Sequence, residues 1–184
     1  MTMLVSARTC LLFFFGVLGL ALTGCASSGS RTQLLTDSPP NIERIAVMVD
    51  LPDSDMRAGF IDQLQESLGL SDIDVVVLRT SRDPREERIA EYGAEAEADV
   101  VLVAGLDGME TQSTVARQQF ASQRFDIAFT LYGVQEQRRI WTSSTTAGRM
   151  FSRTGGRESI GKTIALKALE LMREDRLVPN RSSR

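Results

Sequence analysis

Three apolar stretches separated by two helix-like segments most constrain how this 184-residue chain can fold. The apolar stretches lie at residues 43–51, 73–78 and 98–106, and each has the length and the Val and Ile content of a buried strand. In the first intervening segment, apolar residues recur at helical spacing: Met56, Phe60, Ile61, Leu64 and Leu68. The second opens at Asp83-Pro84 and runs to about Ala96. Helical crossovers of this size predict three parallel strands.

The second half of the chain has a different pattern. Residues 124–134 alternate apolar and polar side chains, which predicts a half-exposed strand, and residues 138–147 return as its hairpin partner. A final amphipathic helix runs from about Ile160 to Asp175. Residues 107–123 form either strand extensions beyond the sheet or a long loop. The predicted fold is α/β with a mixed sheet, in the order β-α-β-α-β-β-β-α, with about five strands and three helices.

The N-terminus has the features of an export signal. Arg8 precedes a 12-residue apolar run at residues 11–22, which is short of the ~20 residues that span a bilayer. The run ends in Leu22-Thr23-Gly24-Cys25, which resembles the bacterial lipobox. The resemblance implies cleavage before Cys25, a diacylglyceryl thioether on its sulfur and an acyl chain such as palmitate on its amino group. The alternatives are an ordinary secretory signal or a buried helix.

The lipobox interpretation divides the chain into four segments. Residues 1–24 are the signal peptide, 25–41 a lipidated flexible tether, 42–178 a single periplasmic domain and 179–184 a frayed tail. Lipoproteins of this kind that stay in the inner membrane commonly have Asp after the cysteine. Because Ala26 stands there instead, the resemblance implies attachment to the outer membrane.

Composition excludes several chemistries. The chain has no His, so it has no His-based triad, His general base or His metal ligand. Of its two cysteines, Cys10 lies in the signal peptide and Cys25 is the predicted lipid attachment site, so the mature chain forms no internal disulfide. We therefore expect no enzyme activity, no metal and no cofactor other than the covalent lipid.

Residues 156–163, Gly-Arg-Glu-Ser-Ile-Gly-Lys-Thr, match the spacing of a Walker A phosphate-binding loop. A true loop of this kind follows a buried strand, and residues 148–154 are too polar for one. Only 21 residues follow Thr163, too few for a further strand with a magnesium-binding acid. We interpret the stretch as a loop followed by the start of a helix, and we expect no nucleotide.

Two smaller features allow both a functional and a structural interpretation. Asp50, Asp53 and Asp107 follow predicted parallel strands, at the edge where α/β folds bind ligands, but helix caps and exposed turns explain the same residues. Trp141 lies in a predicted strand beside Ile140. It is either a core residue or a platform for a sugar ring, and the strand context favours the core.

Charge is divided between the two halves of the domain. Residues 43–110 carry a net charge of −11, and residues 111–184 carry +7. A basic face for an acidic partner is one interpretation, with these candidate residues: Arg138, Arg139, Arg149, Arg153 and Arg157. The other is that the two halves neutralise each other across one sheet. No basic–aromatic pattern indicates nucleic acid.

The stretches IAVMVD, ADVVLVAGL, FDIAFTLYGV and RRIWTSSTTA, with the final helix, resemble in order a group of bacterial envelope lipoproteins. The group includes activators of penicillin-binding proteins, the curli secretion lipoprotein and the N-terminal domain of the Tol periplasmic protein. The resemblance implies a non-catalytic adaptor or accessory factor in envelope assembly or secretion, with a membrane lipid and an envelope protein as its partners. The alternative is an accessory lipoprotein of a transport system that binds a lipid or a cell-wall fragment.

Overall fold

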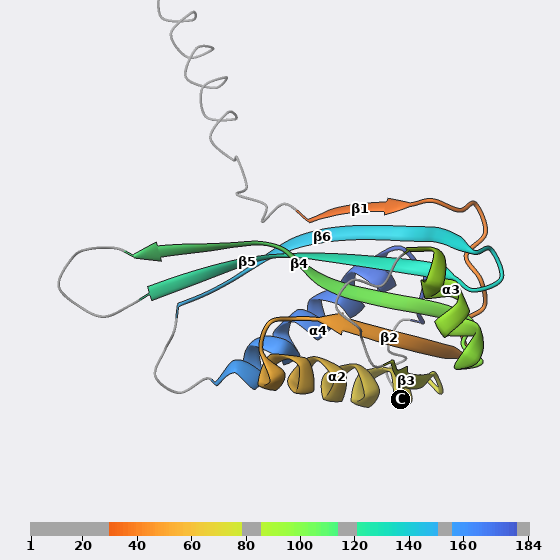
Figure 1. Cartoon of the computed structure of the whole chain (residues 1–184), viewed down its shortest axis with the longest axis horizontal. Helices are drawn as coiled ribbons and strands as arrows, with labels where there is room; N and C mark the ends of the chain where they lie inside the picture. Colours follow the sequence, from red (N-terminus) through yellow and green to blue (C-terminus); the bar gives the residue numbers. More distant parts are fainter. Residues whose placement is uncertain (1–29, 79–85, 114–120, 151–155, 180–184) are drawn as a thin grey trace, which may run out of the picture.

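The computed structural model describes residues 30–78, 86–113, 121–150 and 156–179 (Figure 1). The predicted signal peptide and Cys25 lie outside these residues. The elements follow in the order β1 (Arg31–Leu34), β2 (Arg44–Asp50), α2 (Ser54–Gly69), β3 (Asp74–Val77), α3 (Glu86–Glu95), β4 (Val100–Ser113), β5 (Ala121–Gly133), β6 (Arg138–Met150) and α4 (Arg157–Glu174). The predicted α/β class is confirmed, with one strand more than expected.

The described strands form a single six-stranded sheet in the order β1-β6-β5-β4-β2-β3. β2 pairs in parallel with both β3 and β4, because α2 and α3 each return the chain to the same end of the sheet. β4, β5, β6 and β1 are antiparallel neighbours. The predictions of three parallel strands and a closing β5–β6 hairpin are both confirmed.

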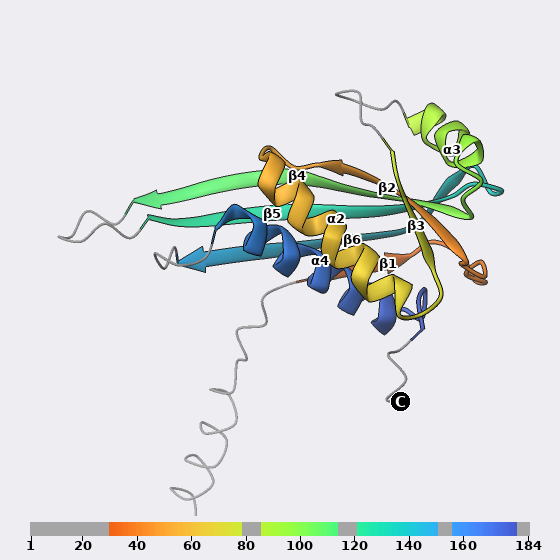
Figure 2. The same cartoon turned by 90° about the horizontal axis from the view of Figure 1, so that it is seen from below.

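Helices α2 and α4 lie side by side on one face of the sheet and form the main core with it (Figure 2). Their buried apolar residues recur every three or four positions, so they form one stripe on each helix. These residues are Met56, Phe60, Leu64 and Leu68 in α2, and Ile160, Ile164, Ala168 and Leu171 in α4. Each fully buried Leu, Ile or Phe side chain contributes about 1.5–3 kcal/mol, so this layer supplies much of the stability of the domain.

The other face of the sheet is covered only in part. The shorter helix α3 lies there and contacts β4 and β5. Its residue Ile89 packs in a second, smaller cluster with Met48, Val101 and Tyr132. Because α3 has ten residues and few apolar ones, it covers a limited area.

The crossing of α2 and α4 depends on two glycines. A Cβ atom on Gly161 would lie 2.0 Å from the Met56 carbonyl oxygen, and one on Gly59 would lie 2.2 Å from the Glu158 carbonyl oxygen. The backbones can approach this closely only without side chains at these positions. Gly161 is also the second glycine of the Walker-like stretch. Its presence there is explained by the packing of α4 against α2.

The expected tether at residues 25–41 is wrong over part of its length. Arg31–Leu34 form β1, which pairs antiparallel with β6, and the Leu35 amide donates to the Ile140 carbonyl oxygen at 2.8 Å. All four β1 side chains are exposed, so the strand is held by its backbone ladder and not by burial. Residues 31–34 show no apolar alternation by which this edge strand could be recognised.

The segment at residues 107–123 is a strand extension where the structure describes it. β4 continues to Ser113 and β5 begins at Ala121, and from Gly108 onward the two strands pair in antiparallel register without interruption. β2 ends opposite Gly105, so β4, β5 and β6 continue beyond it as a three-stranded ribbon (Figure 1). A register shift between Leu106 and Gly108 marks where the ribbon leaves the body of the sheet.

Candidate functional site

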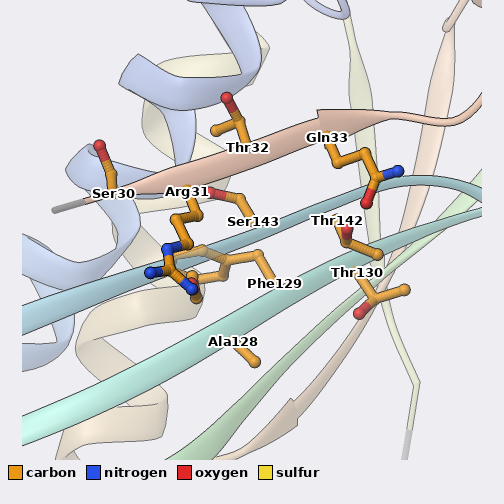
Figure 3. A pocket seen from close by; sticks show the side chains of 10 residues that line it. Ser30, Arg31, Thr32, Gln33, Ala128, Phe129, Thr130, Thr142 and Ser143 are labelled. Carbon is orange, nitrogen blue, oxygen red and sulfur yellow. The ribbon is translucent and has the colours of Figure 1, made fainter.

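The candidate site lies on the side of β1, β6 and β5 that faces away from α2 and α4, which we call the open face. Cross-strand register places its residues in two rows: Arg31, Ser144, Ala128 and Gly105 in one, and Gln33, Thr142, Thr130 and Val103 in the other. The side chains beyond Arg31 in the first row are small. The surface there is hollowed into a pocket of about 690 Å³ (Figure 3).

Hydroxyl groups dominate the lining of this pocket. Thr130, Thr142 and Ser144 are half-buried, whereas Arg31 and Gln33 are exposed on β1. Figure 3 shows the Arg31 side chain extending from β1 across β6. The lining supplies one cation with hydrogen-bond donors and acceptors, and it includes no carboxylate or thiol to act as a base or nucleophile. This arrangement suits binding of a polar surface.

The three predicted acids do not form a ligand site together. Asp53 is the N-cap of α2, and its carboxylate accepts from the backbone amides of Asp55 and Met56 at 3.0 and 3.2 Å. The Arg157 guanidinium, hydrogen-bonded to Asp53, lowers the pKa of that carboxyl, and the two amides act in the same direction. Asp50 and Asp107 are exposed. Among the described residues, no three acidic or cysteine side chains come together as metal ligands would.

The candidate basic residues are spread over the molecule. Arg138 and Arg139 begin β6, whereas Arg149 lies eleven residues along the same strand, ~36 Å away at 3.3 Å per residue. Arg157 begins α4 and forms an ion pair with Asp53. Arg153 lies outside the described residues. The structure therefore does not gather these arginines on one face.

Charges of the two halves meet where α4 lies beside α2. Lys162 forms an ion pair with Glu158 at 2.6 Å, and this hydrogen bond raises its pKa. The charges of Asp62 and Glu66 on α2 act in the same direction. The Arg157–Asp53 pair and the action of Asp62 and Glu66 on Lys162 support the interpretation that the acidic and basic halves neutralise each other.

Trp141 is a core residue. Its side chain is fully buried, and its Nε1–H donates to Asp175 Oδ2 at 2.6 Å, just beyond the end of α4. A fully buried indole offers no surface for a sugar ring, so the core interpretation is correct. The sequence pattern did not predict the open face, because residues 31–34 of its edge strand β1 were assigned to the tether. The hydroxyl run at residues 142–146 was the available signal.

Comparisons with known proteins show the fold. The PelC dodecamer from Paraburkholderia phytofirmans matches with a TM-score of 0.53 and 14% identity, over 78% of this chain and 96% of that one. A single-residue variant of the same PelC dodecamer matches with a TM-score of 0.53 and 16% identity, over the same shares of the two chains. Lipoprotein GNA1162 from Neisseria meningitidis gives a TM-score of 0.47 at 12% identity, over 71% of this chain and 98% of that one.

No protein-family model matches the chain, and no curated protein sequence is similar to it. The particular lipoprotein group suggested by the order of elements therefore stays a prediction. None of the described helices is long and apolar enough to cross a membrane.

Proposed function

We propose that this protein is a non-catalytic lipoprotein of the bacterial envelope. In this proposal a lipid on Cys25 holds it to the outer membrane, and the domain faces the periplasm and works through protein contacts in envelope assembly or secretion. The observation that carries the proposal is the open face, a hollowed, polar sheet surface that α3 covers only beside β4 and β5. Surfaces of this composition suit contacts with a polar partner.

We further propose that the first partner of the domain is a second copy of the chain, which adds to it at the edges of the sheet. The PelC protein that shares the fold is a dodecamer. β1 and β3 are the two edges of the sheet, and they run in opposite directions, so β1 of one copy and β3 of the next could form an antiparallel ladder. Leu34 on β1 and Val77 on β3 are each about two-fifths exposed, at 41% and 42%, which gives both edges an apolar side chain to bury.

Photo-crosslinking in intact cells tests the protein contact. A photoreactive phenylalanine analogue replaces Gln33 on the open face, with the exposed Gln65 on α2 as the matched control. We expect adducts of twice the monomer mass from position 33 and none from position 65. An adduct with a different protein would keep the adaptor function and reject self-association. Monomer alone at both positions, with efficient photoactivation, would contradict the proposal.

Labelling with radioactive palmitate tests the anchor separately. Cys25→Ala should abolish labelling and membrane retention, because the thioether has no sulfur to form on. Cys10→Ala is the matched control and should label normally. Label incorporated into Cys25→Ala would overturn the anchoring proposal without bearing on the contacts of the domain.

The predicted alternative, an accessory lipoprotein that binds a ligand, is favoured by a separate pocket beside the end of α4.

A further inference from the structure

A second pocket, of about 540 Å³, lies where the connection between β1 and β2 meets the residues that follow α4. Its apolar lining includes Pro39, Ile42 and Val178, and its polar lining is Asn41 with two arginines, Arg173 and Arg176. Figures 1 and 2 show both chain segments at the end of the sheet opposite the three-stranded ribbon of β4, β5 and β6. No acidic side chain is among the residues that line this pocket.

The Arg173 side chain has a buried donor without a hydrogen-bond acceptor among the described residues. It lies in the last turn of α4, and its Nε atom is buried without a hydrogen-bond acceptor in the described part of the chain. A buried charged donor left unpaired is costly, and such groups ordinarily have a partner. Glu170 and Glu174 line an adjoining pocket of about 480 Å³ with the two arginines, yet neither is within ion-pair distance of them. Glu170 pairs with Lys167 instead.

Arg176 occupies a position that favours glycine. The Leu177 amide donates to the Met172 carbonyl oxygen at 2.8 Å, and the Arg176 amide to that of Arg173 at 3.1 Å, which together close α4 in a Schellman motif. Arg176 is the left-handed residue of this motif, with φ of 59°.

Glu97 holds the same position after α3, with φ of 54°, and its carboxylate pairs with Arg44 at 3.3 Å. The Arg176 guanidinium makes no ion pair or side-chain hydrogen bond within the described residues. Two arginines three residues apart thus line one pocket without a counter-charge of their own.

We infer that this pocket binds a phosphate group, held between Arg173 and Arg176. Each guanidinium carries several N–H donors in one plane and can bind two oxygens at once. Two guanidinium groups can therefore bind more oxygens than the two that a carboxylate has. A phosphate offers three or four oxygens and enough negative charge to offset both cations. The apolar residues beside the arginines accommodate the organic part of a phosphate ester. This inference does not depend on the proposed anchor or on self-association.

Calorimetric titration of the full-length protein, extracted in a non-ionic detergent, tests the site. Two probes are compared at constant ionic strength: inorganic phosphate, and glycerol 3-phosphate, the deacylated head group of the anionic phospholipid phosphatidic acid. We expect saturable binding of at least one. Affinity should fall ~10- to 100-fold in Arg173→Gln and in Arg176→Gly, because each loses a charged hydrogen-bond partner. Arg88→Gln, an exposed arginine on α3, is the matched control and should bind as the wild type does.

Thermal unfolding shows whether each variant is still folded, so that a loss of binding can be assigned to the missing arginine. Glycine relieves the left-handed backbone at position 176, so Arg176→Gly should unfold at a higher temperature than the wild type while binding phosphate more weakly. Tighter binding of the head group than of phosphate identifies a lipid as the source, and equal binding identifies free phosphate. Absence of binding by the wild type, or full affinity retained in Arg176→Gly, would overturn the inference.

Discussion

Replacing Gly161 by Ala tests whether the crossing of α2 and α4 is set by backbone contact. The new Cβ would lie 2.0 Å from the Met56 carbonyl oxygen and 2.8 Å from the Phe60 nitrogen. Both are backbone atoms, so no side chain can rotate away. The helices must therefore part by about 1 Å, and a gap of that size forfeits roughly a quarter to a half of the dispersion energy across it.

The expected loss of unfolding free energy in Gly161→Ala is the difference between two opposing effects. Overpacking costs about 1–3 kcal/mol, with the upper end expected where the clash is with backbone. Ala recovers ~1 kcal/mol of helix propensity over Gly. The net destabilisation is about 2 kcal/mol, which lowers Tm by ~4–8 °C in a domain of this size.

Urea unfolding followed by tryptophan fluorescence measures this change, because the single tryptophan, Trp141, is fully buried in the core. Gly69→Ala is the matched control, since a Cβ there meets nothing within 4 Å and the residue does not have a positive φ. It should gain ~0.4–1 kcal/mol. If Gly161→Ala were as stable as Gly69→Ala, the proposed close approach of the helices would be refuted.

Three further substitutions probe single contacts. Asp53→Asn should unfold at a lower temperature than the wild type at pH 7, and the difference in Tm should shrink as pH falls below the unfolded carboxyl pKa of about 3.9. The sign follows because Arg157 lowers the pKa of folded Asp53, so its stabilisation is present above that range and lost on acidification; a constant difference down to pH 2 would contradict it. Ser143→Ala should raise the free energy of unfolding by about 1 kcal/mol, because it removes a buried hydroxyl without a described partner; a lower urea midpoint would show that the hydroxyl is paired. Asp175→Ala should cost ~2 kcal/mol by removing the carboxylate that accepts from Trp141, and a red-shifted Trp141 emission in the folded state should accompany the loss.

The helices and strands that were predicted correctly are those whose pattern of apolar residues follows from which side chains are buried. β2 and the first seven residues of β4 are continuous apolar runs because both faces are covered there, and α2 and α4 carry one apolar stripe because one side meets the sheet. The Asp53 cap was also predictable, since its effect is local to the first turn of α2. In each case the neighbouring sequence contains the physical cause.

The features that were missed depend on residues far apart in the chain. β1 has no buried side chain, so nothing in Arg31–Leu34 distinguishes it from a linker until β6 is beside it. The Arg157–Asp53 pair joins residues 104 positions apart. The dispersal of the arginines along β6 follows from the length of that strand, which continues to Met150 and not to residue 147 as expected. The Arg173 and Arg176 pocket likewise requires the β1–β2 connection to fold back against the end of α4.

The pairing of β1 with β6 changes how far the domain could move from a membrane. If Cys25 carries lipid as proposed, only five residues separate it from Arg31, the first residue of β1. Six steps of extended chain cover at most ~20 Å, against ~50 Å for the sixteen residues from Ala26 to Asn41 that follow Cys25 in the expected tether. The domain would then be confined to a thin layer at the bilayer surface, with β1 as its nearest edge. Within that layer, neighbouring copies would meet in a fixed orientation and at a local concentration set by the membrane area.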